Sequence, residues 1–122
     1  MEDFKMIDIT KRKMESSRLL KKFPDRVPVL VKPGNKNTPE IDKCKYLVPS
    51  DMTIGEFLII IRKRVKIDST KALFVFVNNV LPPTNISMRS LYEQQAESDG
   101  FLYLAYSIEN TFGYIFMDTI NF

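Results

Sequence analysis

Two positions in this 122-residue chain have residue types that could take part in covalent chemistry. Gly113 lies near the C-terminus, neither in a hairpin turn nor after a helix, the two places where a glycine usually has a structural reason. Nine further residues, Tyr114 to Phe122, follow it. Cys44 is the only cysteine and stands between Lys43 and Lys45. Gly113 is therefore left without a structural reason, and Cys44 offers a thiol.

Histidine is absent from the sequence. This excludes Ser-His and Cys-His catalysis and most zinc sites, so Cys44 has no base to orient it. A single cysteine cannot form an internal disulfide, which fits a reducing compartment. We therefore expect no catalytic residue and no metal or cofactor site.

The composition is that of one globular domain, with 44% apolar and 27% charged residues. No apolar run approaches the roughly 20 residues that span a bilayer, and the N-terminus is charged rather than signal-like, so we expect a cytosolic protein. Seven basic residues crowd between Lys11 and Arg26. They indicate either a solvated helix face or a surface for an acidic partner.

The N-terminal half alternates helical and strand patterns. Residues 3–22 look helical, with Asp8 or Thr10 as the N-cap of the longer segment. In the strand predicted over residues 27–31 the valines share one face, and Pro28 and Leu30 share the other. The strand over residues 45–48 pairs Lys45 with Leu47 and Tyr46 with Val48 in the same way.

Thr53 and Glu56 form a capping box that opens an amphipathic helix. Its apolar stripe faces a core and consists of Ile54, Phe57, Leu58, Ile61 and Val65, while Ile60 lies outside the stripe. Residues 73–77 read as a central strand because they are apolar on both faces. A turn at 78–79, a short strand at 80–81, a helix at 87–95 and a strand at 101–106 follow. This order predicts an α+β fold, the ubiquitin-like β-grasp with an extra N-terminal helical segment.

Long stretches of the chain resemble the autophagy ubiquitin-like modifiers, the family of the GABA-receptor-associated protein and the microtubule-associated light chains. The matching stretches are Arg18 with FPDRVPV at 23–29, PEIDK at 39–43, KYLVP at 45–49, IRKR at 61–64, FVFVN at 74–78, LPPT at 81–84, DGFLY at 99–103 and ENTFG at 109–113. They cover nearly everything from Glu15 to Gly113.

The resemblance implies a precursor that a cysteine protease trims after Gly113, removing Tyr114 to Phe122. Activating and conjugating enzymes then pass the Gly113 carboxylate to phosphatidylethanolamine, so the protein would be a substrate rather than an enzyme. Glycine suits a narrow enzyme channel because it has no side chain, and Phe112 offers an apolar grip. The expected parts are a helical extension (1–24), a β-grasp domain (25–113) and a tail (114–122). Residues 107–111 are expected to form a flexible connection between the folded domain and an enzyme channel or bilayer. The expected locations are the cytoplasm and, once lipidated, the autophagosomal membrane.

The resemblance also implies binding of cargo receptors that carry an aromatic residue followed three positions later by Leu, Ile or Val. Such a peptide adds as a strand to a sheet edge. The first pocket carries over onto Glu15, Leu19, Pro28, Leu30, Lys45, Leu47 and Phe101. The second carries over onto Tyr46, Val48, Met52, Phe57 and Ile60. Arg26 and Lys43, together with Lys45, would attract acidic residues flanking the motif.

Four features depart from the family pattern: Cys44 replaces a basic residue, the loop before Pro39 is about one residue short, the first nine residues match poorly, and the tail is long and apolar. An exposed apolar tail invites aggregation, so we expect it to be removed early or sheltered. Two alternatives stay open. One is an unconjugated adaptor, and the other is a basic cytoskeletal or nucleic-acid binder, although no nucleic acid is expected because the basic cluster lacks interleaved aromatic residues. We expect a monomer.

Overall fold

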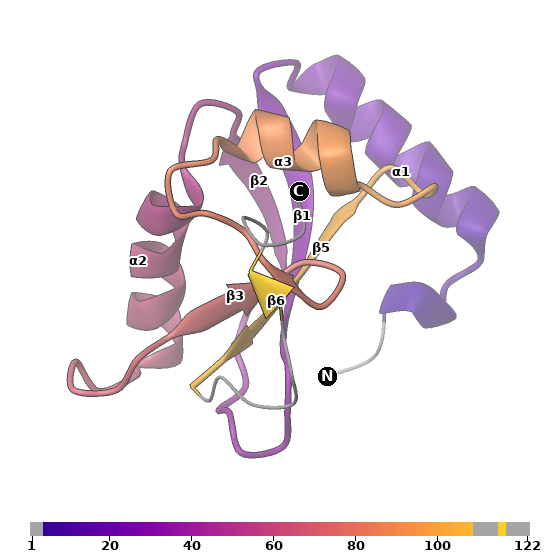
Figure 1. Ribbon diagram of the computed structural model, residues 1–122. Coiled ribbons are helices and arrows are strands. Elements are labelled where there is room, and N and C mark those ends of the chain that lie inside the picture. Colours follow the sequence, from indigo (N-terminus) through magenta and orange to yellow (C-terminus); the bar gives the residue numbers. More distant parts are fainter. Residues whose placement is uncertain (1–3, 109–114, 117–122) are drawn as a thin grey trace.

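The computed structural model describes residues 4–108 and 115–116 (Figure 1). Its elements, in chain order, are η1 Phe4–Met6, α1 Ile9–Lys22, β1 Arg26–Pro33, β2 Lys45–Pro49, α2 Ile54–Val65, β3 Phe74–Phe76, β4 Val80–Leu81, α3 Met88–Gln95, β5 Leu102–Ser107 and β6 Ile115–Phe116. A four-stranded sheet in the order β2-β1-β5-β3 forms the centre of the molecule. The mixed sheet with its helices confirms the predicted β-grasp.

The central pair of strands, β1 and β5, runs parallel, with Leu30 opposite Tyr103. β2 and β3 pair antiparallel on the two outer sides. The prediction of a central strand at residues 73–77 was therefore wrong, because β3 lies at the end of the sheet. The last strand also runs to Ser107, which is buried, rather than ending at Tyr106 before a flexible stretch.

The alternating side chains of β1 divide between two apolar clusters. Val27, Val29 and Val31 belong to the main core with residues of α2. Leu30 points to the opposite face, in a smaller cluster with Phe4 and Phe101 against which Leu19 of α1 packs. The helices α2 and α1 thus cover opposite faces of the sheet.

Helix α2 begins at the predicted capping box. Thr53 Oγ1 accepts a hydrogen bond from the Glu56 amide at 3.2 Å, and the Thr53 amide donates to Glu56 Oε1 at 3.0 Å. The Thr53 amide and the Thr53 hydroxyl both donate to the Glu56 carboxylate, and these two bonds lower the pKa of Glu56. Four residues of the predicted stripe are buried, while Leu58 is half-buried.

The N-cap of α1 is Asp8, one of the two caps predicted for the longer helical segment, and its side chain accepts from the Thr10 amide at 3.0 Å. A separate 3₁₀ turn, η1, precedes it. Arg12 turns inward and pairs with Asp99, with 2.8 Å between Nη1 and Oδ2. Asp99 is 1% exposed, so this ion pair is buried and ties α1 to the start of β5.

A tight turn and a short helix follow β3. Asn78 and Asn79 have positive φ of 52° and 65°, and the amides and carbonyls of Val77 and Val80 bond to each other across them. This is the tight turn that the sequence predicted. Helix α3 begins after Ser87, whose hydroxyl accepts from the Ser90 amide at 3.1 Å.

Candidate functional site

A groove of about 410 Å³ lies between helix α1 and the edge strand β2. Its lining residues are Glu15, Leu19, Arg26, Pro28, Lys43, Lys45, Tyr46, Leu47 and Phe101. Six of the seven residues predicted for the first pocket therefore lie together, and the two predicted steering residues, Arg26 and Lys43, join them. Leu30 is not among the lining residues, because it packs in the cluster beneath with Phe4 and Phe101.

Regular secondary structure explains why these residues meet. Glu15 and Leu19 are four apart on α1 and share one face. Pro28 lies directly opposite Leu47 in the β1–β2 register, so both point to the same side of the sheet. Among the described strands, β2 pairs with β1 alone. Within the described part of the chain, the outer edge of β2 is thus open to an added strand beside the groove.

The groove carries more positive than negative charge, with Arg26, Lys43 and Lys45 against Glu15. Lys45 Nζ lies 2.8 Å from Glu15 Oε1, in a bridge from β2 to α1. Arg26 Nη1 donates to the Leu47 carbonyl at 3.1 Å. Lys43 Nζ lies 5.2 Å from the centre of the Tyr46 ring. Such a surface suits an apolar peptide with acidic flanks.

The five residues predicted for the second pocket belong to the main core or pack against it. Val48 and Phe57 are each 2% exposed, whereas Tyr46, Met52 and Ile60 are half-buried. The Tyr46 ring meets Phe57 edge-on, with 5.5 Å between ring centres. Burial raises the pKa of Tyr46, whose hydroxyl is buried without a hydrogen-bond partner among the described residues. The accessible part of this set is Tyr46, Met52 and Ile60.

Comparisons with known proteins agree on one family. The family model described as "Autophagy protein Atg8 ubiquitin like" matches residues 11–113. Autophagy-related protein 8e of Arabidopsis thaliana is 56% identical over 107 residues, which cover 87% of this chain and 88% of that protein. The chain belongs to the Atg8 family. Autophagy-related protein 8 of Kluyveromyces lactis is 55% identical over 104 residues and covers 84% of each chain.

Solved Atg8 structures have the same fold. That of Trypanosoma brucei ATG8 superposes with a TM-score of 0.83 at 37% identity, covering 93% of this chain and 99% of that one. Plasmodium falciparum Atg8, in complex with a Plasmodium falciparum Atg3 peptide, gives 0.82 at 33% identity, covering 92% and 100%. This chain is therefore an Atg8-type ubiquitin-like autophagy protein.

The residues predicted for processing, Phe112 and Gly113, lie outside the described residues. Gly113 is the last residue of the Atg8 family match. Of the tail beyond it, β6 is described, and it pairs parallel with β4, with Val80 opposite Ile115 and Leu81 opposite Phe116. Figure 1 shows β6 in yellow at the front of the molecule. The expectation that the tail is removed early or sheltered stays a prediction.

Sequence reasoning missed two features beside the groove. Phe4 is buried against Leu30 and Phe101, although the first nine residues match the Atg8 pattern poorly. The Arg12–Asp99 ion pair holds the helix that contributes Glu15 and Leu19. Neither feature could be predicted from the sequence. A single apolar residue at position 4 shows no periodicity, and the members of the ion pair are 87 positions apart.

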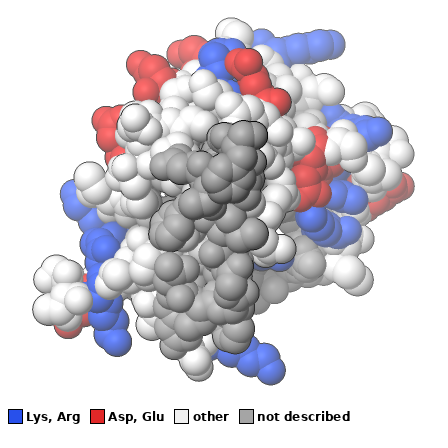
Figure 2. All heavy atoms as spheres, in the orientation of Figure 1, with Lys and Arg blue, Asp and Glu red and all other residues white. Residues whose placement is uncertain are grey.

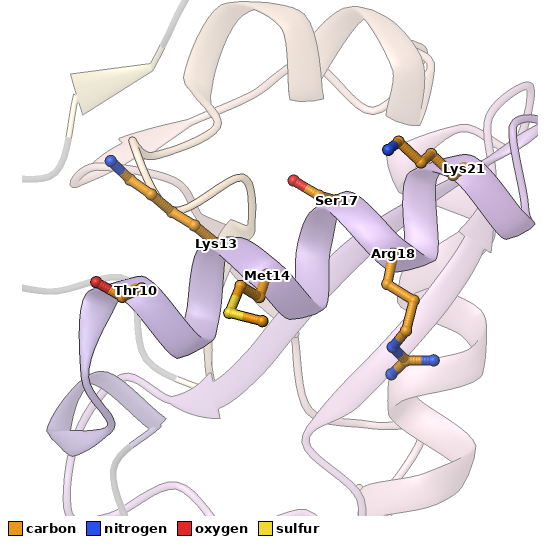
Figure 3. Close-up of a pocket in the computed structure, with 6 residues that line it drawn as sticks. All are labelled: Thr10, Lys13, Met14, Ser17, Arg18 and Lys21. Carbon is orange, nitrogen blue, oxygen red and sulfur yellow. The ribbon is translucent and has the colours of Figure 1, made fainter.

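A second hollow, of about 540 Å³, lies along the outer flank of α1. Figure 3 shows its lining side chains spread along the helix rather than converging on one point; they are Thr10, Lys13, Met14, Ser17, Arg18 and Lys21. On the face drawn in Figure 2, acidic and basic side chains are interspersed. Two members of the basic cluster at residues 11–26 have separate contacts: Arg12 pairs with the buried Asp99, and Arg26 lines the groove.

The described residues bear on two other kinds of site. Within residues 4–108 and 115–116, no group of three or more His, Cys, Asp or Glu side chains could hold a metal ion. No helix in the same ranges combines the length and apolar character needed to cross a bilayer.

Proposed function

We propose that this chain is a lipid-conjugated modifier of autophagy that recruits cargo receptors through aromatic-x-x-aliphatic motifs. One observation carries the motif-binding part. An apolar groove with a basic rim lies beside an open strand edge, and six predicted pocket residues line it. An extended peptide can pair with β2 and insert its aromatic side chain between Leu19 and Leu47.

The aliphatic side chain of the motif would lie three residues along the added strand. Tyr46, Met52 and Ile60 offer the half-buried apolar surface for it. The complex of Plasmodium Atg8 with an Atg3 peptide supports peptide binding as a family property. We propose an Atg3-type conjugating enzyme among the partners of this chain, together with motif-bearing cargo receptors.

The conjugation part of the proposal rests on the family match, which ends at Gly113. A cysteine protease would hydrolyse the Gly113–Tyr114 bond. The freed carboxylate would be adenylated by ATP with release of pyrophosphate, then transferred to an enzyme cysteine with release of AMP. The amine of phosphatidylethanolamine would displace that thiol and form an amide, anchoring the protein to the autophagosomal membrane. In these steps the chain is a substrate and supplies no catalytic group.

The mass of the protein in its own cells tests this part. Wild type is expected as a species ending at Gly113 and a heavier one that carries the mass of a lipid. Gly113→Ala is expected to lose the lipidated species. Wild-type protein that keeps Tyr114 to Phe122 would contradict processing and favour the unconjugated adaptor.

Leu47→Ala tests the groove. Leu47 is half-buried and belongs to neither buried cluster, so the domain is expected to stay folded. Truncating a peptide-contact leucine costs about 1 to 2 kcal/mol, or roughly a 5- to 30-fold weaker affinity. Calorimetric titration with a synthetic peptide that contains tryptophan, two spacers and leucine after acidic residues measures this change.

The matched control is Met14→Ala. Met14 is 67% exposed and lines the outer hollow of α1 instead of the groove. Its replacement is expected to leave the peptide affinity unchanged. Equal affinities of wild type and Leu47→Ala would remove the peptide from this groove. Weaker binding of Met14→Ala alone would move it to the hollow of Figure 3.

A further inference from the structure

A side chain of the same protein packs beside the groove, against two of the residues predicted for the first pocket, Leu30 and Phe101. Phe4, in η1, is 9% exposed. Its ring meets Phe101 edge-on, with 4.9 Å between ring centres and 71° between the ring planes. Phe101 lines the groove, and Leu30 completes the cluster with both rings. Leu30 is the one predicted pocket residue that does not line the groove, and Phe4 packs in its cluster.

A second contact places Phe4 at the pocket rather than merely near it. Lys45 Nζ lies 4.8 Å from the centre of the Phe4 ring and 2.8 Å from Glu15 Oε1. Both Lys45 and Glu15 line the groove. An aromatic side chain that entered between Lys45 and Phe101 would therefore meet Phe4 at once. Phe4 is not itself a lining residue of the groove; it covers the part of the predicted pocket that lies at Leu30 and Phe101.

The segment that carries Phe4 is weakly held. η1 has three residues; its last residue, Met6, and the next one, Ile7, are 80% and 43% exposed. Besides Phe4, its contacts with the domain include the ion pair of Lys5 with Glu97, with side chains 43% and 33% exposed, and the contact of Lys5 Nζ with the Tyr103 ring at 4.4 Å. Exposed ion pairs contribute little to stability. Such a segment can open locally while the rest of the domain stays folded.

We propose that Phe4 is a displaceable occupant of the first pocket, which the aromatic residue of a bound motif replaces against Leu30 and Phe101. The proposal rests on the motif binding proposed above and adds its regulation. A ligand that must displace a docked segment binds with an apparent affinity reduced by the fraction of molecules already open. The docked N-terminal segment therefore lowers the apparent affinity of every aromatic ligand for the first pocket, so that weak ligands stay unbound.

The same geometry explains why the occupant is a phenylalanine. The ring makes an edge-to-face contact with Phe101 and accepts the Lys45 ammonium over its own face. An incoming aromatic residue can make both interactions, so the exchange preserves them. An aliphatic side chain can make neither. The first pocket would accordingly favour aromatic ligands, because only an aromatic ring can take over both interactions of Phe4.

Peptide titration of the full chain tests the proposal with Phe4→Ala and, as matched control, Met6→Ala. Met6 is in the same 3₁₀ turn but is 80% exposed. The peptide is the tryptophan-x-x-leucine peptide described above, and its fluorescence is specific because the chain has no tryptophan. Phe4→Ala is expected to bind about three- to tenfold more tightly than wild type, and Met6→Ala to bind like wild type. Weaker binding by Phe4→Ala would show that Phe4 contributes to peptide binding, and equal binding would show that it does not compete with the peptide. Either result would overturn the proposal.

Amide hydrogen exchange supplies a second readout on the wild-type chain. The Ile7 amide donates to the Phe4 carbonyl at 3.1 Å, and the Arg12 amide donates to the Asp8 carbonyl at 3.1 Å at the start of α1. Saturating peptide is expected to speed exchange at Ile7 and leave Arg12 unchanged. Unchanged or slower exchange at Ile7 would overturn displacement. If no variant binds the peptide, the proposed motif binding fails as well, whereas equal binding by all variants removes only the displacement.

Discussion

Asp99→Ala is expected to lower the free energy of unfolding by about 3 kcal/mol, on the order of a hundredfold in the unfolding equilibrium. Its carboxylate accepts from Arg12 at 2.8 Å, from the Phe101 amide at 3.0 Å and from the Tyr103 hydroxyl. Alanine leaves these donors without their acceptor while Arg12 stays largely buried, 14% exposed. Loss of a partner in a buried network costs more than the pair contributes, since the remaining groups stay desolvated. Urea denaturation measures the change.

Two controls separate the buried ion pair from a mere charge effect. Asp42→Ala removes another aspartate that pairs with an arginine, Arg64, at 3.0 Å, but the two side chains are 71% and 39% exposed. Its expected effect is below about 1 kcal/mol. Asp99→Asn keeps one acceptor oxygen and should fall between the two alanine variants. If Asp99→Ala were as mild as Asp42→Ala, the Arg12–Asp99 pair would not be what holds α1 on the domain.

Residues whose partners are close in sequence were predicted well. The capping box of Thr53 and Glu56, the turn at Asn78 and Asn79, and the alternation along β1 all depend on neighbours within a few positions. The pockets followed from the family resemblance, and strand parity and helix register brought six predicted residues into one groove. Periodicity also placed Ile60 outside the apolar stripe of α2; Ile60 is half-buried, and Ile59, at 56% exposed, is the exposed large apolar residue of this helix.

The features that sequence reasoning missed are set by tertiary contacts. Apolarity on both faces of β3 suggested a central strand, but strand order depends on long-range pairing, and β3 lies at an end. Arg12 read as one of seven basic residues on a solvated face, whereas Asp99, 87 positions away, draws it inward. Phe4 looked like part of a divergent N-terminus. Its burial depends on the contact with Leu30 and Phe101, and no pattern within the first residues of the sequence predicts that contact.

The docking of α1 and the state of the groove are physically coupled. Glu15 and Leu19 form one wall of the groove, and Arg12 and Ser16 hold the same helix to the residues before β5. Ser16 Oγ donates to the Asp99 carbonyl at 2.6 Å. A change that loosens this attachment should weaken peptide binding even though it touches no groove residue. A side chain at Gly100, next to Asp99, would collide with Ser16 and so loosen this attachment directly.

Gly100→Ala is expected to destabilise the fold by about 2 to 4 kcal/mol. Gly100 has φ of +85°, a conformation that a side chain strains. A Cβ at this position would lie 2.3 Å from Ser16 Oγ and 2.8 Å from Ser16 Cβ. Because Ser16 is 3% exposed on α1, the helix itself would need to move. Urea denaturation and the peptide titration should both report the loss.

Two comparisons make this prediction sharp. Gly34→Ala places a Cβ no closer than 3.4 Å to the Tyr106 carbonyl oxygen, and its cost should be small. The double variant Gly100→Ala with Ser16→Gly removes the steric conflict but keeps the backbone strain, so its cost should be less than the sum of the two single changes. Strict additivity would mean that Gly100 acts only through its backbone conformation. Equal stability of Gly100→Ala and Gly34→Ala would mean that α1 is not packed on Gly100, and the proposed coupling between the helix and the groove would fail with it.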